Sequence, residues 1–428
     1  MRMRVILYVV LCSITVFGRV AYVVHDRTFE QIAGPEEMER AAISLVREGF
    51  IGQVYSDSTG KSAHLSPLYP LFLAGLYWIF GWETSTGRLA QEVCAITATT
   101  LSISLLPVVA GRAHLAVAAG WAAAYALAIL PINLWVETSG IWEQPYASLA
   151  LLGFFIIFCR LQDEQWHNSR TIFFVGLLLG ILALLSPSLL PAAVLMIIAA
   201  WVTQRSNRKR IVVASIVMGC GAGLVVSPWI VRNYYALGGF IPLRSNFGLE
   251  LATFNNPEVT GKTLGSSAEL APILRRIHPS YNATEAARVV AMGEVAYMRA
   301  KQQAAWQWIK EHPGKTIELI AYRFRFYWFP SRDMWEQNSP ARGLKAAIMS
   351  IISLTALVSI IYLISTGHNR AWLLAAAVIG PSLVYMIITV SVRYRYPITG
   401  LSTLLALHLS LVAWQSITRK VQSAVGVR

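Results

Sequence analysis

Charged residues are scarce in this sequence. Asp, Glu, Lys and Arg make up 14% of the 428 residues, against 55% for hydrophobic residues. Soluble domains carry about 25% charged residues, so the shortage argues against a soluble globule and favours a polytopic membrane protein. Cysteine is also rare, and Cys12, Cys94, Cys159 and Cys220 all fall within apolar runs. They are expected to be small buried side chains, and no disulfide framework is predicted.

Aspartate occurs only four times, at Asp26, Asp57, Asp163 and Asp333, and no Asp-x-Asp pair is present. This pattern argues against a nucleotide-sugar donor held by a metal ion. There is no Gly-rich phosphate-binding loop, and no cluster of His, Cys and acidic residues has metal-ligand spacing. We therefore predict no cofactor and no metal site, with a divalent metal left open as the alternative.

Long apolar runs predict ten membrane-spanning helices. They cover Val5–Val24, 88–110, 114–133, 144–161, 171–186, 188–203, 210–231, 342–366, 370–391 and 397–416. The first run spans roughly 30 Å at about 1.5 Å per residue, one hydrocarbon core, and is predicted to be a retained helix. A shorter run, Pro67–Phe80, is predicted to be an interfacial or re-entrant helix. The expected fold is therefore an all-α polytopic membrane protein with about 10–11 transmembrane helices.

Basic residues predict the orientation. With the N-terminus inside, every short inner connection carries Arg, Lys or His, as the positive-inside rule expects. The same rule explains the net charge of +14, so no nucleic-acid partner is predicted. Two long loops then lie outside, which divides the chain into a first helix (1–24), a first outer loop (25–87), a helical bundle (88–231), a second outer loop (232–341), and C-terminal helices with a cytoplasmic tail (342–428).

Each outer loop is predicted to contain helices near the membrane surface. In the stretch AGPEEMERAAISLVREGF (33–50), Met38, Ala41, Ala42 and Leu45 follow helical spacing. This pattern predicts a short amphipathic helix lying on the membrane surface. In the second loop, helix formers predict one continuous helix over Glu285–Glu311.

Three motifs carry a family resemblance. They are HLSPLYPLFLAGLYWIFG (64–81), SPWIVRNYYALGGFIPLRSNFGLEL (227–251) and VRYRYP (392–397). In this order, and over nearly the whole chain, they resemble membrane glycosyltransferases of the GT-C class. The resemblance is strongest to the bacterial family related to protein O-mannosyltransferases and the lipid A aminoarabinose transferase. It implies a GT-C-like fold, a bacterial plasma or inner membrane location, and a sugar donor linked to polyprenyl phosphate.

In that family an acid of the first outer loop activates the acceptor, a few residues before a Tyr-x-x-x-Ala-x-x-Leu pattern. Here Met38 stands at the Tyr position, and Gly34 and Pro35 stand where the family has its acid. The resemblance then implies Glu37 as the catalytic base, with Glu36 as the near alternative and Asp26 as an outside candidate. The structural alternative is that the negative charges of Glu36 and Glu37 only stabilise the positive N-terminal end of the helix dipole.

The chemistry suits a single carboxylate. A glycosidase needs a second acid to protonate its leaving group, whereas a lipid phosphate departs as a stable anion. One base contributes typically ~10²–10⁴-fold. The leaving phosphate instead needs cations such as arginine. The predicted phosphate-binding residues are Arg393 and Arg395, which point to the same side if locally extended, with Arg232, Arg244 and Arg19. The alternative for Arg19 and the Arg393/Arg395 pair is snorkelling to lipid headgroups.

Other polar and aromatic residues are predicted to line the substrate cavity. They are Glu143, His64, Tyr69, Asn246, Glu250 and Tyr396. Glu143 begins a span, where helix-start electrostatics explains it equally well. His64 is a lone histidine, a type that more often has a structural role.

The predicted function is transfer of a sugar from a polyprenyl-phosphate donor to an acceptor hydroxyl on the extracytoplasmic face, with inversion. The competing class is a transporter or lipid flippase, which usually shows inverted repeats and charges near the midplane. A third alternative is an inactive family member with a scaffold role. The sequence leaves open the sugar and whether the acceptor is protein, lipid or polysaccharide.

Overall fold

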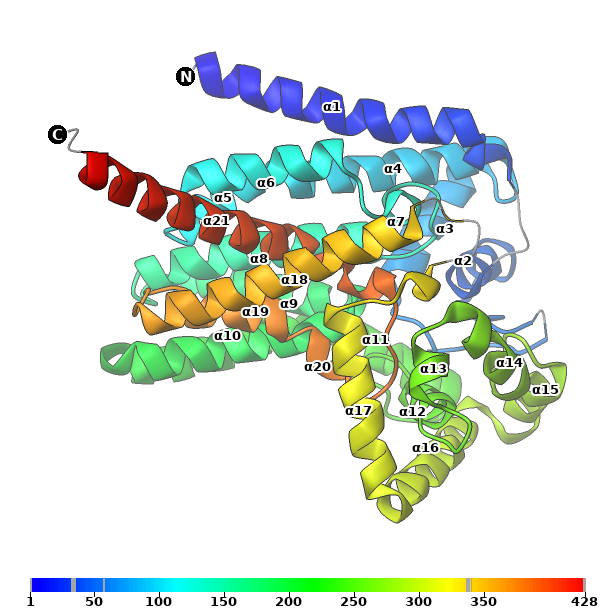
Figure 1. Cartoon of the computed structure of the whole chain (residues 1–428). Helices are drawn as coiled ribbons and strands as arrows, with labels where there is room; N and C mark the ends of the chain where they lie inside the picture. Colours follow the sequence, from blue (N-terminus) through cyan, green and yellow to red (C-terminus); the bar gives the residue numbers. More distant parts are fainter. Residues whose placement is uncertain (1, 32–35, 57, 336–338, 340, 426–428) are drawn as a thin grey trace.

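The protein is described by a computed structural model that covers residues 2–31, 36–56, 58–335, 339 and 341–425 (Figure 1). Gly34 and Pro35 lie outside the described residues. Within these residues the chain forms helices and no β-strand, apart from one isolated bridge between Gly52 and Lys61. The all-α class predicted from the sequence is confirmed.

A bundle of long apolar helices forms the larger part of the molecule (Figure 1). Its helices are α1 (Arg2–Asp26), α4 (Ser85–Ser104), α5 (Leu106–Arg112), α6 (Val117–Ile129), α8 (Gln144–Asp163), α9 (Ser169–Leu185), α10 (Leu190–Thr203), α11 (Arg208–Leu237), α18 (Arg342–Ser365), α19 (Ala371–Ile379), α20 (Ser382–Tyr385) and α21 (Tyr396–Val425). Six helical segments among the described residues are long and apolar enough to cross a membrane.

The remaining predicted spans coincide with shorter apolar helices. These are Val117–Ile129, Ser169–Leu185, Pro187–Thr203 and Ala371–Tyr385, while Leu68–Phe80 matches the predicted interfacial helix. Prolines explain the shorter lengths, because Pro131 follows α6, Pro187 follows α9 and Pro381 follows α19. Proline lacks the N–H needed to continue the helical hydrogen bonds. Each of the ten predicted spans therefore corresponds to an apolar helix.

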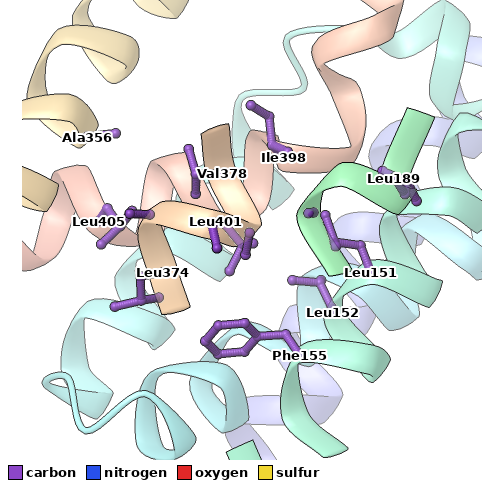
Figure 2. Close-up of a cluster of buried hydrophobic side chains, with 14 of the residues drawn as sticks. Leu151, Leu152, Phe155, Leu189, Ala356, Leu374, Val378, Ile398, Leu401 and Leu405 are labelled. Carbon is purple, nitrogen blue, oxygen red and sulfur yellow. The ribbon is translucent and has the colours of Figure 1, made fainter. Parts of the chain in front are cut away.

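The core of the bundle is packed from side chains of α8, α19 and α21 (Figure 2). Leu151, Phe155, Leu374, Leu401 and Leu405 are each at most 1% exposed. Burial of a leucine or phenylalanine side chain contributes about 1.5–3 kcal/mol. This packing holds the first turns of α21, and with them the VRYR segment that precedes it, in a defined place.

The turns predicted to be cytoplasmic gather at one end of the bundle. Asn369 Nδ2 donates to His114 Nδ1 at 2.9 Å, and Arg370 forms an ion pair with Asp163. These contacts join the turns that follow α5, α8 and α18. The start of α1 and the end of α21 lie at the same end (Figure 1). The alternation of inner and outer connections predicted from the basic residues is therefore consistent with this arrangement.

The opposite end of the molecule carries the two long loops (Figure 1). Their helices are α2 (Glu37–Glu48), α3 (Leu68–Phe80), α12 (Phe247–Phe254), α13 (Gly261–Leu264), α14 (Ser267–Ile277), α15 (Ala283–Met292), α16 (Glu294–Glu311) and α17 (Pro313–Trp328). The short helix α7 (Leu134–Glu137) lies in the connection between α6 and α8. Short 3-10 turns cover Thr28–Glu30, Pro187–Leu189, Arg205–Asn207, Arg332–Met334 and Val392–Arg395. The helix predicted over 285–311 is divided at Gly293, whose φ of 77° belongs to the left-handed region that favours glycine.

The apolar stripe of α2 packs inside the protein, in contrast to the predicted position on the membrane surface. Met38, Ala41 and Ala42 are at most 1% exposed, and they belong to one buried cluster with Leu73 and Tyr77 of α3. An amphipathic pattern predicts that one face is buried, but it does not say whether lipid or protein covers it. Packing on α3 fixes the start of α2 against the rest of the outer region.

A first prediction tests the orientation. Cysteines introduced in a cysteine-free background at Lys61 and Lys262 are expected to react with a membrane-impermeant thiol reagent added to intact cells, because the outer loops face outward. A cysteine at Lys209 is expected to react only after permeabilisation. All three positions are exposed, so reactivity reports the side of the membrane. Labelling at Lys209 without labelling at Lys262 would reverse the topology and remove the proposed site from the outer face.

Candidate active site

A cavity of about 480 Å³ lies where the first outer loop, the second outer loop and the segment before α21 meet. Its polar lining includes Glu36, Glu37, Glu250, His278 and Arg393. Glu36 and Glu37 come from the start of α2, and Arg393 comes from the 3-10 turn Val392–Arg395. The cavity therefore brings together both predicted catalytic glutamates and one of the predicted phosphate-binding arginines.

Both carboxylate oxygens of Glu37 already have partners. Oε2 lies 3.3 Å from His64 Nε2. Oε1 accepts a hydrogen bond from Ser280 Oγ and lies 3.7 Å from His278 Nδ1. Burial raises the pKa of Glu37, but the interactions with His64, His278 and Ser280 outweigh it and hold this pKa well below its usual range. A carboxylate of low pKa is a weak proton acceptor, so the geometry does not favour Glu37 as the base.

Glu36 has the features expected of a general base. It occupies the N-cap position of α2 with an extended backbone, and its side chain does not cap the helix. It is exposed and lines the cavity. Displacement of water by the cavity walls raises the pKa of Glu36, and the positive charge of Arg393 opposes this effect. A carboxylate with a raised pKa accepts a proton more readily, so the geometry shifts the preference from Glu37 to Glu36.

Arg393 also lines the cavity. Its guanidinium group lies 3.6 Å from the centre of the Trp142 ring, a cation–π contact that fixes its plane. Nη2 donates to Tyr394 Oη at 3.4 Å, while Nε is buried with no hydrogen-bond partner among the described residues. A buried donor without a partner costs about 1–3 kcal/mol. An anionic ligand in the cavity would satisfy it.

Arg395 does not share the position of Arg393. It is 2% exposed, and Nη1 donates to the backbone carbonyls of Trp328 and Met349 at 3.2 and 3.1 Å. The expectation that both arginines point to one side assumed an extended segment, whereas Val392–Arg395 is a 3-10 turn. At about three residues per turn, positions two apart face different directions. Of the two arginines predicted to bind phosphate together, only Arg393 lines the cavity.

Tyr396 and Arg19 both belong to the interior of the bundle. Tyr396 Oη lies 3.2 Å from Thr99 Oγ1. Arg19 is fully buried and forms an ion pair with Glu137 at 2.7 Å. Its nitrogens also donate to the carbonyl oxygens of Ala128 and Leu127 at 2.8 and 2.9 Å. Arg19 therefore neither snorkels to lipid headgroups nor reaches the cavity, and this geometry gives it a structural role.

The other two predicted phosphate-binding arginines tie the outer loops together. Arg232 donates to the carbonyls of Ser62 and Ile51 at 2.8 and 2.6 Å, and it lines a separate, mostly apolar cavity of about 640 Å³. Arg244 donates to the carbonyl of His64 at 3.0 Å. Neither lines the cavity that contains Arg393.

The predicted cavity-lining residues divide into two groups. Glu250 lines the cavity and accepts a hydrogen bond from Asn246 Nδ2 at 3.3 Å. Glu143, next to the cavity residue Trp142, is 6% exposed, and its Oε2 has no hydrogen-bond partner among the described residues. Tyr69 instead packs in the cluster beneath α2 and is 1% exposed. Its role in this structure is apolar packing.

The remaining acidic candidates lie away from the cavity lining. Asp26 ends α1 and lies 3.8 Å from His25. Glu39 accepts a hydrogen bond from Tyr77 at 2.8 Å and lies 4.0 Å from Arg88. Glu39 therefore faces α3 and α4, whereas Glu36 and Glu37 line the cavity.

Most of the cavity-lining residues were not anticipated from the sequence. Trp142, His278, Ser280 and Tyr281 line the cavity together with Glu36. Trp142 belongs to the same IWEQPY stretch as Glu143, and its aromatic ring could have been noted there. His278, Ser280 and Tyr281 lie in a loop between α14 and α15 that has no motif. Only the folding of the second loop over α2 brings them to the site.

No protein-family model and no curated protein sequence matches this chain. Solved structures do match this chain. The apo oligosaccharyltransferase of Archaeoglobus fulgidus superimposes with a TM-score of 0.55 and 12% identity, over 99% of this chain and 52% of that protein. The same enzyme tethered to an acceptor peptide superimposes with a TM-score of 0.50 and 12% identity, over 91% of this chain and 47% of that protein. ArnT from Cupriavidus metallidurans bound to undecaprenyl phosphate superimposes with a TM-score of 0.36 and 14% identity, over 95% of this chain and 77% of that protein.

The chain spans about half the length of the archaeal enzyme. At 12% identity the match concerns the path of the chain and not individual side chains. It extends over the whole of this chain, including the membrane bundle and the outer helices. The chain therefore has a GT-C-type membrane fold, as its motifs predicted.

Proposed function

We propose that this protein is a membrane glycosyltransferase that moves a sugar from a polyprenyl-phosphate donor to an acceptor hydroxyl on the extracytoplasmic face. The observation that supports the proposal most directly is the pairing of Glu36 with Arg393 in one cavity. The lining contains the exposed carboxylate of Glu36 and the guanidinium of Arg393, whose Nε has no hydrogen-bond partner among the described residues. Transfer from a lipid phosphate requires this pairing, whereas glycoside hydrolysis requires two acids.

In the proposed reaction the acceptor hydroxyl oxygen attacks the anomeric carbon of the donor sugar. Glu36 takes the hydroxyl proton as the new C–O bond forms. The bond between the anomeric carbon and the phosphate oxygen breaks, and its electron pair leaves with the phosphate. Arg393 stabilises the resulting charge by charge-assisted hydrogen bonds. Attack and departure on opposite faces of the sugar lead to inversion.

The fold supports the same assignment. The archaeal oligosaccharyltransferase that shares it has been solved with an acceptor peptide, so this architecture accommodates an acceptor beside a membrane bundle. For the present chain the acceptor class stays open among protein, lipid and polysaccharide. The cavity and its charged lining lie at one end of the bundle, which favours a transferase over a transporter.

A transfer assay tests the proposal. Purified protein in lipid nanodiscs is supplied with a panel of undecaprenyl-phosphate-linked sugars and a membrane extract as acceptor, and release of free undecaprenyl phosphate is measured. One donor is expected to be consumed, and consumption is expected to depend on the acceptor. In proteoliposomes, movement of the intact lipid-linked sugar between leaflets without release of the phosphate would instead identify a flippase.

A further inference from the structure

A second polar cavity lies at the other end of the bundle, where the turns predicted to be cytoplasmic gather (Figure 1). It has a volume of about 700 Å³ and is lined by residues from the turns that follow α5, α8, α10 and α18. This volume falls within the range of about 300–1,000 Å³ that is usual for ligand sites. The proposed transfer reaction does not use this cavity.

The lining of this inner cavity contains hydrogen-bond donors. Arg370 is 5% exposed, and its Nε has no hydrogen-bond partner among the described residues. His114 Nδ1 accepts a hydrogen bond from Asn369 Nδ2 at 2.9 Å, which leaves the ring proton on Nε2 as a further donor. Arg205 is exposed and lines the same cavity. Buried and exposed donors are therefore available together to one acceptor-rich ligand.

Positive charge exceeds negative charge around the inner cavity. Among the described residues its lining contains one acidic side chain, Asp163, which forms an ion pair with Arg370 and lies 3.8 Å from Arg112 Nη1. With Arg205, three positive charges thus stand against one negative charge. The helix α19 also begins here, and no side chain caps its first turn. The positive end of its dipole adds to the preference for an anion.

An apolar groove reaches the same end of α10. It is a cavity of about 370 Å³ between α10 and α11, and its lining residues are Ile197, Ile198, Trp201, Ile211, Val212, Ser215 and Ile216. Trp201 of this groove and Val202 of the inner cavity are neighbours in the sequence. The guanidinium of Arg208 lies 4.4 Å from the centre of the Trp201 ring. A polar cavity rich in cations and an apolar groove therefore meet at one turn.

We propose that the inner cavity and the apolar groove together bind one anionic glycerophospholipid, with the phosphate in the cavity and an acyl chain in the groove. Basic pockets between membrane helices on the cytoplasmic side bind anionic headgroups in this way. A soluble anion would satisfy the donors of the cavity but would leave the groove unfilled. Because both cavities border apolar helices of membrane-spanning length or composition, a lipid of the adjacent leaflet is the ligand that matches both.

The bound lipid would connect the ends of several helices. Its headgroup would contact the turns after α5, α8, α10 and α18, which are distant in the sequence. A ligand that binds only the folded state stabilises it, so the lipid is expected to raise the melting temperature of the bundle. The inference does not depend on the proposed transfer reaction, because Glu36 and Arg393 line a different cavity.

Native mass spectrometry of the purified full-length protein tests this inference. Phosphatidylglycerol and phosphatidylcholine with identical acyl chains are titrated into the protein in a neutral detergent, and the retained lipid is counted. The wild type is expected to retain one phosphatidylglycerol at least about fivefold more tightly than phosphatidylcholine, whose choline cation cancels the phosphate charge. Equal affinities for the two lipids would overturn the proposal.

A pair of arginine variants separates the cavity from general surface charge. Arg205→Gln is expected to lower the affinity for phosphatidylglycerol about fivefold, since each cation near a lipid surface contributes about that factor. Arg170→Gln is the matched control, because Arg170 is an exposed arginine near the start of α9 that lines neither the inner cavity nor the apolar groove. An equal loss in both variants would contradict a defined site. Unchanged melting temperatures without added lipid establish that both variants are folded.

A groove variant and a soluble phosphate distinguish a lipid from a free anion. Ser215→Phe places an aromatic ring in the apolar groove and is expected to weaken phosphatidylglycerol binding at least about fivefold. Glycerol 3-phosphate, the headgroup without acyl chains, is expected not to displace the lipid at equal concentration. Displacement by glycerol 3-phosphate together with normal lipid binding in Ser215→Phe would identify a soluble phosphate ligand and overturn the proposal.

The donor site is separated by one further variant. Arg393→Ala is expected to retain phosphatidylglycerol as the wild type does, because Arg393 lies outside the inner cavity. Loss of phosphatidylglycerol in this variant would place the bound lipid at the candidate active site and overturn the inner site. All of these measurements use neither sugar donor nor acceptor, so their failure would leave the proposed transfer reaction untouched.

Discussion

Glu36→Gln is expected to lower the rate of sugar transfer by about two orders of magnitude or more, because glutamine keeps the size of glutamate but cannot accept the acceptor proton. Donor binding is expected to remain, since the side chain acts on the acceptor. Single-turnover transfer and equilibrium donor binding, measured on purified protein, separate the two effects.

Glu39→Gln is the matched control for this change. Glu39 lies on the same helix but contacts Tyr77 and Arg88, outside the cavity lining. The Glu39→Gln substitution is expected to leave the transfer rate within about twofold of the wild-type rate, because the Glu39 carboxylate does not contact the reacting atoms. Normal turnover in Glu36→Gln would contradict the assignment of the base. Loss of turnover in Glu37→Gln together with normal turnover in Glu36→Gln would move the assignment by one residue.

The pH dependence of the reaction gives a further check on Glu36. The surrounding protein raises the pKa of this carboxyl, and a base must be unprotonated to act. Activity is therefore expected to fall as the pH decreases through this raised pKa, at a higher pH than the ordinary glutamate value of about 4.3 implies. Glu37 has a lowered pKa, so an acidic limb far below the ordinary value would indicate Glu37 instead.

Arg393→Ala is expected to weaken donor binding about 10–100-fold, because a hydrogen bond to a charged group contributes about 1.5–3 kcal/mol. Arg393→Lys keeps the charge but loses the planar fork and the stacking on Trp142, so an intermediate loss is expected. Binding of undecaprenyl phosphate and of a neutral undecaprenyl alcohol, measured side by side, distinguishes loss of phosphate recognition from loss of lipid binding.

Arg395→Ala separates phosphate binding from folding. Its guanidinium donates to the carbonyls of Trp328 and Met349, so its removal takes away two buried hydrogen bonds and is expected to lower the melting temperature. Donor affinity of the folded fraction is expected to remain close to that of the wild type. Reduced affinity in Arg395→Ala together with unchanged affinity in Arg393→Ala would assign phosphate binding to Arg395 instead.

Sequence periodicity predicted the membrane bundle well, because the bilayer imposes one length and one polarity on every span. It also predicted that Glu36 and Glu37 would lie together at the start of a helix. It could not predict which of them is accessible, because that depends on His64, His278 and Ser280. These side chains reach Glu37 only through tertiary contacts.

The dependence of the site on tertiary contacts and on local backbone conformation explains two further points that the sequence did not predict. His64 and His278 approach Glu37 across two loops, and no spacing along the sequence indicates this convergence. The direction of Arg393 depends on one 3-10 turn, and a change from extended to helical backbone over four residues redirects one of the two arginines. Sequence patterns define the boundaries of helices least well, and this turn lies directly before the start of α21.

The buried pair of Arg19 and Glu137 has a consequence for biogenesis. Glu137 follows Arg19 by 118 residues, so at a synthesis rate of about 5–20 residues per second it leaves the ribosome roughly 6–24 s later. During that interval an arginine in an apolar helix costs up to about 2.5–3.5 kcal/mol to insert. The first helix is the least buried of the six long helices. It is therefore expected to stay beside the translocon, where Arg19 remains hydrated, until its partner arrives. Release into the bilayer becomes favourable once α7 arrives and neutralises the arginine, which makes docking of the first helix a late step in assembly.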